Sequence, residues 1–217
     1  MSWSYALSPY IIHPETFNDD VVIYFDDTVS IINDQFNKSE YHLLILPRDP
    51  ELTKKHPAVT IDYSLKYHTL NKYVNWCQNY IYESFTQKFE ILSRDLISKD
   101  SFINNFIKVG VHSVPSMKNL HIHVITKDFH SIKLKNKKHY NSFNTRFFIE
   151  YCQLPLDDLP DKEEMEGDVI KKSDLICSYC KRNYGNKFSQ LKKHLELEFN
   201  THFRTRERHK RKINEVE

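Results

Sequence analysis

Polar and apolar residues alternate strictly from Asn119 to Ile125, and this stretch constrains the fold more than any other. Successive side chains of a β-strand point to opposite faces, so a strand here separates two sets of residues. One face receives Leu120, Ile122 and Val124, and the other receives Asn119, His121 and His123. Same-face neighbours on a strand lie about 6 to 7 Å apart. Two imidazoles are therefore predicted to share one face, with an ordinary half-buried strand as the alternative.

A turn before this strand carries two more polar candidates. Pro115 lies between His112 and Ser116 and favours a turn that folds both residues back toward the histidines. Neutral imidazole is a nucleophile near its own pKa, and neighbouring imidazoles can donate hydrogen bonds to phosphate oxygens. The cluster therefore predicts chemistry at phosphorus.

The remaining pattern predicts an α+β fold. Short apolar or β-branched runs indicate strands at 21–24, 28–32, 41–46 and 106–111, and their short connections favour antiparallel pairing. Apolar residues at helical spacing between 61 and 92 indicate one long amphipathic helix that covers the sheet. We therefore predict an antiparallel sheet with covering helices, followed by a small C-terminal domain.

Length and charge divide the chain. Its 217 residues, 40% of them hydrophobic, suffice for one domain and a small appendage. Acidic residues crowd 157–168, whereas 133–138 and 204–212 are basic, which fits a polyanionic partner or solvated charge runs. The predicted parts are a catalytic domain at 1–153, an acidic linker at 154–170, and a finger with a basic tail at 171–217. No apolar run or leader points to a membrane, so we expect an intracellular protein.

The C-terminal part contains a predicted structural zinc site. Cys177 and Cys180 form a Cys-x-x-Cys pair, and thirteen residues separate Cys180 from His194. Two thiolates and one imidazole supply three ligands for tetrahedral zinc. Glu198 follows His194 by four residues on the same helical face, whereas His202 is about 12 Å further along a continuous helix. Glu198 is therefore the predicted fourth ligand; His202 replaces it if the helix breaks. A redox-active Cys pair without metal is the alternative.

The same motifs resemble a known family. The active-site strand is similar to that of the histidine-triad (HIT) nucleotide hydrolases and transferases. Within that family the chain most resembles the fungal type of the aprataxin branch. The resemblance lies in four sequence segments: V-H-S-V-P-S-M at 111–117, L-H-I-H-V-I at 120–125, D-F at 128–129 and L-K-N-K-K-H-Y-N-S-F-N-T at 134–145. A zinc ligand set of two cysteines, one histidine and one glutamate is also found in that branch. The resemblance implies a HIT-like fold with a C-terminal zinc finger.

The resemblance also implies an activity. Such enzymes hydrolyse the adenylate that abortive ligation leaves on a DNA 5′ end, releasing AMP and restoring the 5′-phosphate during strand-break repair. His121 matches the nucleophile that forms a covalent adenylyl-histidine, and the residues matched to phosphate binding are His112, Ser116 and His123. No metal is expected in the chemical step. Asn119 stands where the family has the first triad histidine, and its amide cannot titrate.

Further site residues follow from the same resemblance. Asp34 matches the ribose-binding position, and the other residues expected at the nucleotide are Ile32, Leu46 and Asn119. The expected DNA contacts are Lys133, Lys135, Lys138, His139, Lys192 and Arg204. We expect a monomer that acts on nicked or double-stranded DNA in the nucleus, with the cytoplasm as a second location. Two alternatives stay open: a general HIT hydrolase of free dinucleotides or phosphoramidates, and a zinc-dependent nick-binding module without turnover.

Overall fold

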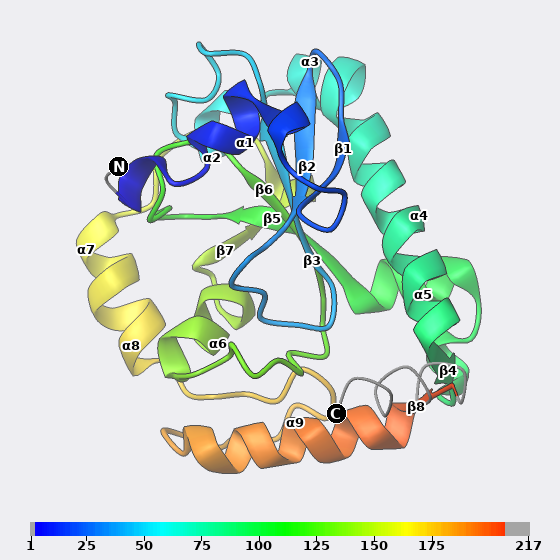
Figure 1. Cartoon of the computed structure of the whole chain (residues 1–217). Coiled ribbons are helices and arrows are strands. Elements are labelled where there is room, and N and C mark those ends of the chain that lie inside the picture. The colour runs from blue at the N-terminus through cyan, green and yellow to red at the C-terminus, as the bar shows by residue number, and fades with distance from the viewer. Residues whose placement is uncertain (1–2, 207–217) are drawn as a thin grey trace.

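The computed structural model describes residues 3–206, and the predicted basic tail beyond them lies outside this range. A six-stranded sheet forms its centre (Figure 1), and all neighbouring strands in it are antiparallel. In sheet order the strands are β1 (Val22–Phe25), β2 (Val29–Asn33), β3 (His42–Pro47), β6 (Ile122–Thr126), β5 (Ile107–His112) and β7 (Phe148–Glu150). The predicted α+β class is confirmed.

The alternating stretch forms a strand that begins later than predicted. β6 starts at Ile122, because the preceding segment bonds elsewhere: the Leu120 amide donates to the Thr53 carbonyl, and the Lys118 amide donates to the Ser4 carbonyl. Leu120, Ile122 and Val124 nevertheless enter the main core, as the alternation predicts.

The predicted long helix over 61–92 is present but shorter, and it contains a π-helical turn. It runs without interruption through α3 (Tyr63–Leu65), the π-helical turn η3 (Lys66–Leu70) and α4 (Asn71–Lys88). α4 packs against β3 and β6 through a face of buried side chains, namely Tyr73, Val74, Cys77, Ile81 and Phe85. The chain then becomes extended at Phe89, where β4 (Phe89–Ile91) pairs with the distant strand β8 (Phe203–Thr205).

Short helices surround the sheet. The N-terminal segment contains η1 (Trp3–Tyr5), α1 (Ser8–Ile12) and η2 (Pro14–Thr16), and the first crossover contains α2 (Pro57–Thr60). Between β4 and β5 lie η4 (Arg94–Leu96) and α5 (Lys99–Phe106), and after β6 come α6 (Lys137–Asn144) and, beyond β7, η5 (Tyr151–Gln153). The Asn136 side chain begins α6 by accepting a hydrogen bond from the His139 amide. No helix within residues 3–206 is long and apolar enough to cross a bilayer.

The C-terminal part packs against the domain that contains the sheet. The segment expected as an acidic linker contains α7 (Lys162–Glu164), η6 (Met165–Val169) and α8 (Ile170–Lys172), of which Met165 and Val169 pack against Phe147. The last helix, α9 (Phe188–His202), runs beneath α6 in Figure 1. One apolar cluster joins both parts, with Leu175, Cys177, Leu191 and Leu195 against Ile125, Phe129, Leu134, Tyr140 and Phe143. The finger and the wall formed by α6 therefore share a core.

Replacing Gly110 with alanine is expected to destabilise the fold by about 1 to 3 kcal/mol, as overpacking does in well-packed cores. A Cβ at this position of β5 would overlap the Ile149 carbonyl oxygen and lie 2.7 Å from a ring carbon of Phe148. Gly167 is the matched control, because a Cβ there meets nothing within 4 Å and removes backbone freedom from a helical segment. Denaturant unfolding of both variants measures the contrast, and equal stability of the two would contradict the close approach of β5 to β7.

Candidate active site and zinc centre

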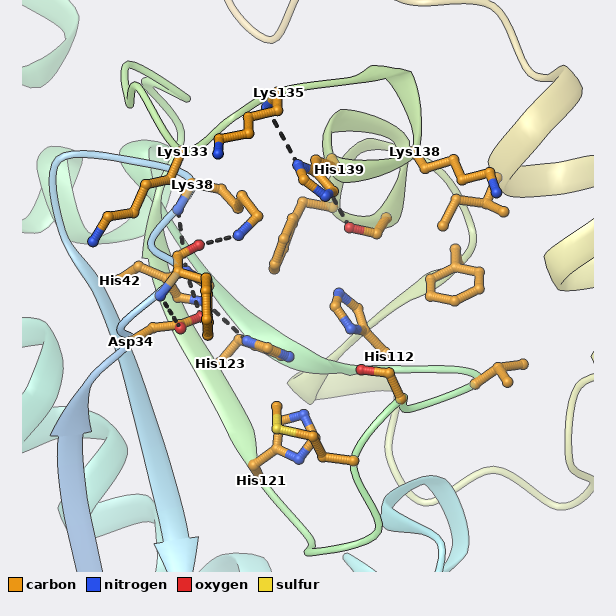
Figure 2. A pocket seen from close by; sticks show the side chains of 18 of the residues that line it. Asp34, Lys38, His42, His112, His121, His123, Lys133, Lys135, Lys138 and His139 are labelled. Atoms are coloured by element: carbon orange, nitrogen blue, oxygen red, sulfur yellow. Dashed lines mark hydrogen bonds and ion pairs between the residues drawn. The ribbon is translucent and has the colours of Figure 1, made fainter. Parts of the chain in front are cut away.

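A cavity of about 800 Å³ opens on the sheet face opposite α4. Figure 2 shows its side chains converging from strands, loops and α6. The floor comes from β3, β5 and the β6 segment, and the rim comes from the loop after β2 and from the 133–139 segment. Its polar lining includes Asp34, Lys38, His42, His112, Ser116, His121, His123, Lys133, Lys135, Lys138 and His139. Its volume and its positive rim suit a nucleotide-sized anion.

His121 presents a free nitrogen to this cavity. Its Nδ1 lies 2.7 Å from the Asn119 carbonyl oxygen, which can only accept a hydrogen bond, so Nδ1 carries the proton. Nε2 therefore keeps its lone pair. Burial lowers the pKa of His121, which keeps the ring neutral at physiological pH. A buried, oriented and unprotonated imidazole nitrogen is what nucleophilic catalysis at phosphorus requires.

Three further histidines surround His121. His123 and His112 have ring centroids 4.4 Å apart, and His121 and His123 have centroids 5.0 Å apart. His42 on β3 adds a fourth ring, with its Nε2 2.9 Å from the His123 Nδ1. Burial lowers the pKa of His42 to about 4 and holds the pKa values of His112 and His123 well below their ordinary range. The cluster is therefore uncharged until an anion enters.

Sequence reasoning missed two residues of this site. His42 lies on an apolar strand, where a histidine is readily taken for a core residue. Its side chain is on the same sheet face as that of His123, because Leu44, two residues after His42, pairs with His123 across the strands. The signal that could have found it is a histidine at the start of the apolar run 42–46, eight residues after Asp34. Lys38 also lines the cavity, and burial lowers the pKa of its ammonium group. A partly desolvated cation beside neutral imidazoles favours a phosphate ligand.

Acid is expected to weaken the fold through these histidines. Because burial lowers the folded-state pKa of His42 to about 4, the unfolded chain binds this proton more readily, and stability is lost as pH falls below the ordinary value of about 6.5. Between about pH 7.5 and about pH 5, His42 alone contributes a loss of about 2 kcal/mol. Denaturant unfolding at both pH values measures it. A His42→Phe variant should lose less stability on acidification than the wild type, and an equal loss would contradict the assignment.

The structure brings most of the predicted site residues to one place. His112, Ser116, His121 and His123 line the cavity with Asp34, Lys133, Lys135, Lys138 and His139. Asp34 is not a free carboxylate: its Oδ2 lies 3.1 Å from the His42 Nδ1, and its Oδ1 accepts a hydrogen bond from the Phe36 amide.

Five predicted contacts lie elsewhere. Ile32 and Leu46 are fully buried beneath α1, in a cluster with Leu7 and Ile11, and do not line the cavity. The Asn119 side chain accepts a hydrogen bond from the Ser8 hydroxyl and donates to the Thr53 hydroxyl, so it anchors the segment before β6. The two remaining side chains are Lys192, which donates to the Leu134 carbonyl, and Arg204, which lies on the β4–β8 ribbon 3.7 Å from Glu90.

The four predicted zinc ligands lie together. One ligand atom from each of Cys177, Cys180, His194 and Glu198 falls within 4.8 Å of all the others. The Cys180 sulfur lies 3.1 Å from the His194 Nε2, which in turn lies 3.0 Å from the Glu198 Oε1. α9 continues without a break to His202, whose Nε2 lies 3.4 Å from the other Glu198 oxygen. Two sulfurs, one imidazole and one carboxylate fit tetrahedral zinc, with His202 contacting the glutamate from outside.

Two family models match the chain. The HIT domain model matches residues 15–130, and the model of the C2HE / C2H2 / C2HC zinc-binding finger matches residues 144–201. The chain belongs to the HIT domain family, with a zinc-binding finger joined to the HIT domain.

Relatives along the whole chain narrow the assignment. The aprataxin-like protein of Saccharomyces cerevisiae is 55% identical over 94% of this chain and 99% of its own length. A crystal structure of the aprataxin ortholog Hnt3 in complex with DNA is 34% identical and covers 92% of this chain and 96% of that one, with a TM-score of 0.73. Hnt3 in complex with DNA and guanosine gives 33% identity, coverage of 92% and 96%, and a TM-score of 0.67. Within the HIT family the chain is thus one of the aprataxin-like proteins, as its motifs predict.

Proposed function

We propose that the chain is a hydrolase that removes AMP from adenylated 5′ ends of DNA through a covalent adenylyl-His121 intermediate. The observation that carries the proposal is the unprotonated His121 Nε2 in a cavity rimmed by lysines. The DNA-bound structures of its relative Hnt3 support a DNA substrate.

The first step forms a phosphorus–nitrogen bond. The His121 Nε2 lone pair attacks the α-phosphorus of the AMP moiety, and the bond to the DNA 5′-phosphate oxygen breaks with its electron pair. The leaving group is a phosphate and is stable as an anion, so neutralising charge matters more than supplying a proton. Lys38, His112 and Ser116 line the cavity where they can hold the phosphate oxygens.

The second step is hydrolysis of the adenylyl-histidine. Water attacks the same phosphorus, the phosphorus–nitrogen bond breaks, and the electron pair returns to the His121 Nε2. The hydrogen bond from Nδ1 to the Asn119 carbonyl holds the ring in place through both steps. In this scheme Asn119 acts through its backbone carbonyl and not through its side chain. The asparagine in place of the first triad histidine therefore does not prevent turnover. Zinc is proposed as a structural ion, and neither step is assigned to a metal.

The cavity rim is proposed to bind the DNA. Lys133 and Lys135 precede α6, Lys138 and His139 lie in its first turn, and Lys171 of α8 lines the same cavity. Backbone phosphates are the natural partners of such cations, and contacts to them carry no sequence preference. We propose a monomer that acts in the nucleus, where this substrate arises.

The decisive experiment is incubation with nicked DNA that carries a 5′-adenylate. Release of AMP together with a religatable 5′-phosphate is expected. A parallel reaction with diadenosine polyphosphate and with an adenosine phosphoramidate tests the general HIT hydrolase alternative, and faster turnover of those substrates would favour it. Tight binding to the nick with no AMP release by zinc-loaded protein would favour the nick-binding module instead.

Lys138→Gln is expected to weaken binding to adenylated nicked DNA about 3- to 10-fold at low salt. Loss of one phosphate contact should lower the slope of log affinity against log salt by about 0.9. Arg204→Gln is the control, because Arg204 lies on the β4–β8 ribbon beside Glu90 and not at the cavity. Fluorescence anisotropy over a salt series measures both. Equal losses in the two variants would contradict an interface centred on the cavity rim.

A further inference from the structure

We propose that His56 is a positioning residue, which holds the loop 113–121 so that His112 and Ser116 keep the positions from which they bind phosphate oxygens. His56 lies on the segment between β3 and α2 and is not one of the residues that line the cavity. The inference deepens the proposed function and rests on it for its kinetic consequences. The contact, and its effect on the mobility of the loop, can be measured without substrate.

The loop 113–121 joins β5 to β6 and carries Ser116 and His121 to the cavity. Its backbone lies outside both strands, so its polar groups need partners from other segments. The half nearest β6 is held by the amides of Lys118 and Leu120, which donate to the N-terminal segment and to the segment after β3. The half nearest β5 is held at Ser113.

The Ser113 peptide is fixed on both sides. Ser113 directly follows His112, is only 2% exposed, and donates its amide to the Phe147 carbonyl over 2.8 Å. Its own carbonyl oxygen lies 2.9 Å from the His56 Nε2. A buried carbonyl that loses its donor is unfavourable, so removal of His56 should make this peptide seek another partner. Any rotation there would move His112 on one side and Ser116 on the other.

The protonation state of His56 follows from its two partners. The Ser113 carbonyl can only accept a hydrogen bond, so the His56 Nε2 carries the proton. The Ala58 amide can only donate, and it lies 3.1 Å from the His56 Nδ1, which therefore provides the lone pair. Pro57 restricts the preceding residue to an extended backbone, and His56 has φ −69° and ψ 128°. The ring is thus oriented by its own neighbour in sequence.

The two ring nitrogens have separable roles. Nδ1 caps α2, which is a structural role, whereas Nε2 holds the active-site loop. In a His56→Asn variant the side-chain oxygen stands where Nδ1 stood and keeps the cap, but the side chain ends too early to reach Ser113. In His56→Gln the side chain is one bond longer and can donate to the Ser113 carbonyl, with no acceptor at the cap position. The two variants therefore retain opposite halves of the imidazole.

Kinetics on adenylated nicked DNA distinguish positioning from stability. His56→Asn is expected to lower the kcat for AMP release at least 10-fold, since a displacement of about 1 Å in a positioned group can cost about 100-fold. His56→Gln should stay within 3-fold of the wild type. The KM should change less than 3-fold in both, because the lysines of the cavity rim lie on other elements. A purely structural role predicts the reverse ranking, with His56→Gln the more impaired.

Two further variants complete the kinetic series. His56→Ser keeps a capping oxygen and lacks the donor, so it should match His56→Asn and replaces it if that variant folds poorly. Glu51→Gln is the control on the same segment, because the Glu51 side chain is exposed and lies 3.7 Å from Lys54, far from a buried carbonyl. Circular dichroism and zinc content should be the same in all of these proteins.

The substrate-free test is hydrogen exchange in zinc-loaded protein, measured by mass spectrometry. His56→Asn should exchange the amides of 113–121 at least 10-fold faster than the wild type, and those of 58–61 at the wild-type rate. His56→Gln should show the opposite pattern, with faster exchange only in 58–61. ¹⁵N NMR of the wild type should show His56 as the Nε2–H tautomer.

The outcomes separate this inference from the function on which it rests. Wild-type kcat and wild-type exchange of 113–121 in His56→Asn would overturn the positioning role, as would a wild-type His56 in the Nδ1–H form. Absence of AMP release from the wild type would instead refute the proposed function. The exchange pattern of the two variants would then decide by itself whether His56 holds the loop.

Discussion

Replacing His121 with alanine is expected to abolish AMP release, with a loss on the order of 10⁴-fold or more, as for other nucleophiles that act with a supporting group. The variant removes the imidazole that the Asn119 carbonyl orients through a hydrogen bond from Nδ1. His112 and His123 remain, but among residues 3–206 no backbone carbonyl accepts a hydrogen bond from either ring. Quantifying AMP from adenylated nicked DNA measures the loss, and no labelled protein should form.

Folding must be shown to survive this change. His121 precedes β6 and forms no pairing in the sheet, so far-UV circular dichroism and zinc content should match the wild type. His68→Ala is the control, because His68 is exposed on η3 beyond the cavity. Turnover of the His121 variant within tenfold of the wild type would refute its role as nucleophile, whatever the substrate.

Cys177→Ser is expected to have the second-largest effect, a loss of bound zinc and a collapse of stability. Structural zinc contributes about 10 to 16 kcal/mol to finger folding, which is comparable with the whole stability of a typical domain. Cys177 also shares an apolar cluster with Leu175, Leu191 and, from α6, Tyr140 and Phe143. The cavity wall should therefore loosen with the finger, and both DNA binding and AMP release should fall. Thermal unfolding and the zinc-to-protein ratio measure these effects.

Cys152→Ser provides the matched comparison. Cys152 is an exposed free thiol on η5, away from the ligand cluster. The Cys152→Ser variant should keep its zinc and melt within about 2 °C of the wild type, since exposed substitutions rarely change stability by more than about 0.5 kcal/mol. Retention of zinc and normal melting by Cys177→Ser would show that the finger does not depend on the predicted ligands.

Local pattern predicted those parts of the fold that local rules determine. The alternation at 119–125 depends on strand geometry alone, and it placed His121 and His123 on the cavity face and Ile122 and Val124 in the core. The spacing of the Cys-x-x-Cys pair and the helical offset from His194 to Glu198 likewise brought four ligand groups together, because each interval lies within one turn or one helix. These signals do not require knowledge of distant contacts.

The errors came from long-range packing. Whether Ile32 and Leu46 face a nucleotide depends on where α1 lies, and α1 covers them. His42 joins the site only because β3 pairs with β6, a contact that its own sequence neighbourhood does not reveal. The helix predicted over 61–92 ends at Lys88 because Phe89 pairs with a strand more than a hundred residues later. Such contacts override local propensity.

The β4–β8 ribbon has a consequence for how the chain reaches its native state. β8 is at residues 203–205, so the ribbon closes only after more than a hundred residues beyond β4 have been synthesised. Until then Phe85, Phe89 and Phe106 lack the rings of Phe199 and Phe203 that cover them. A nascent chain stalled before α9 would expose an aromatic surface that favours aggregation and chaperone binding. Biogenesis of this protein is therefore expected to depend on residues 188–205 as strongly as on the strands that carry its histidines.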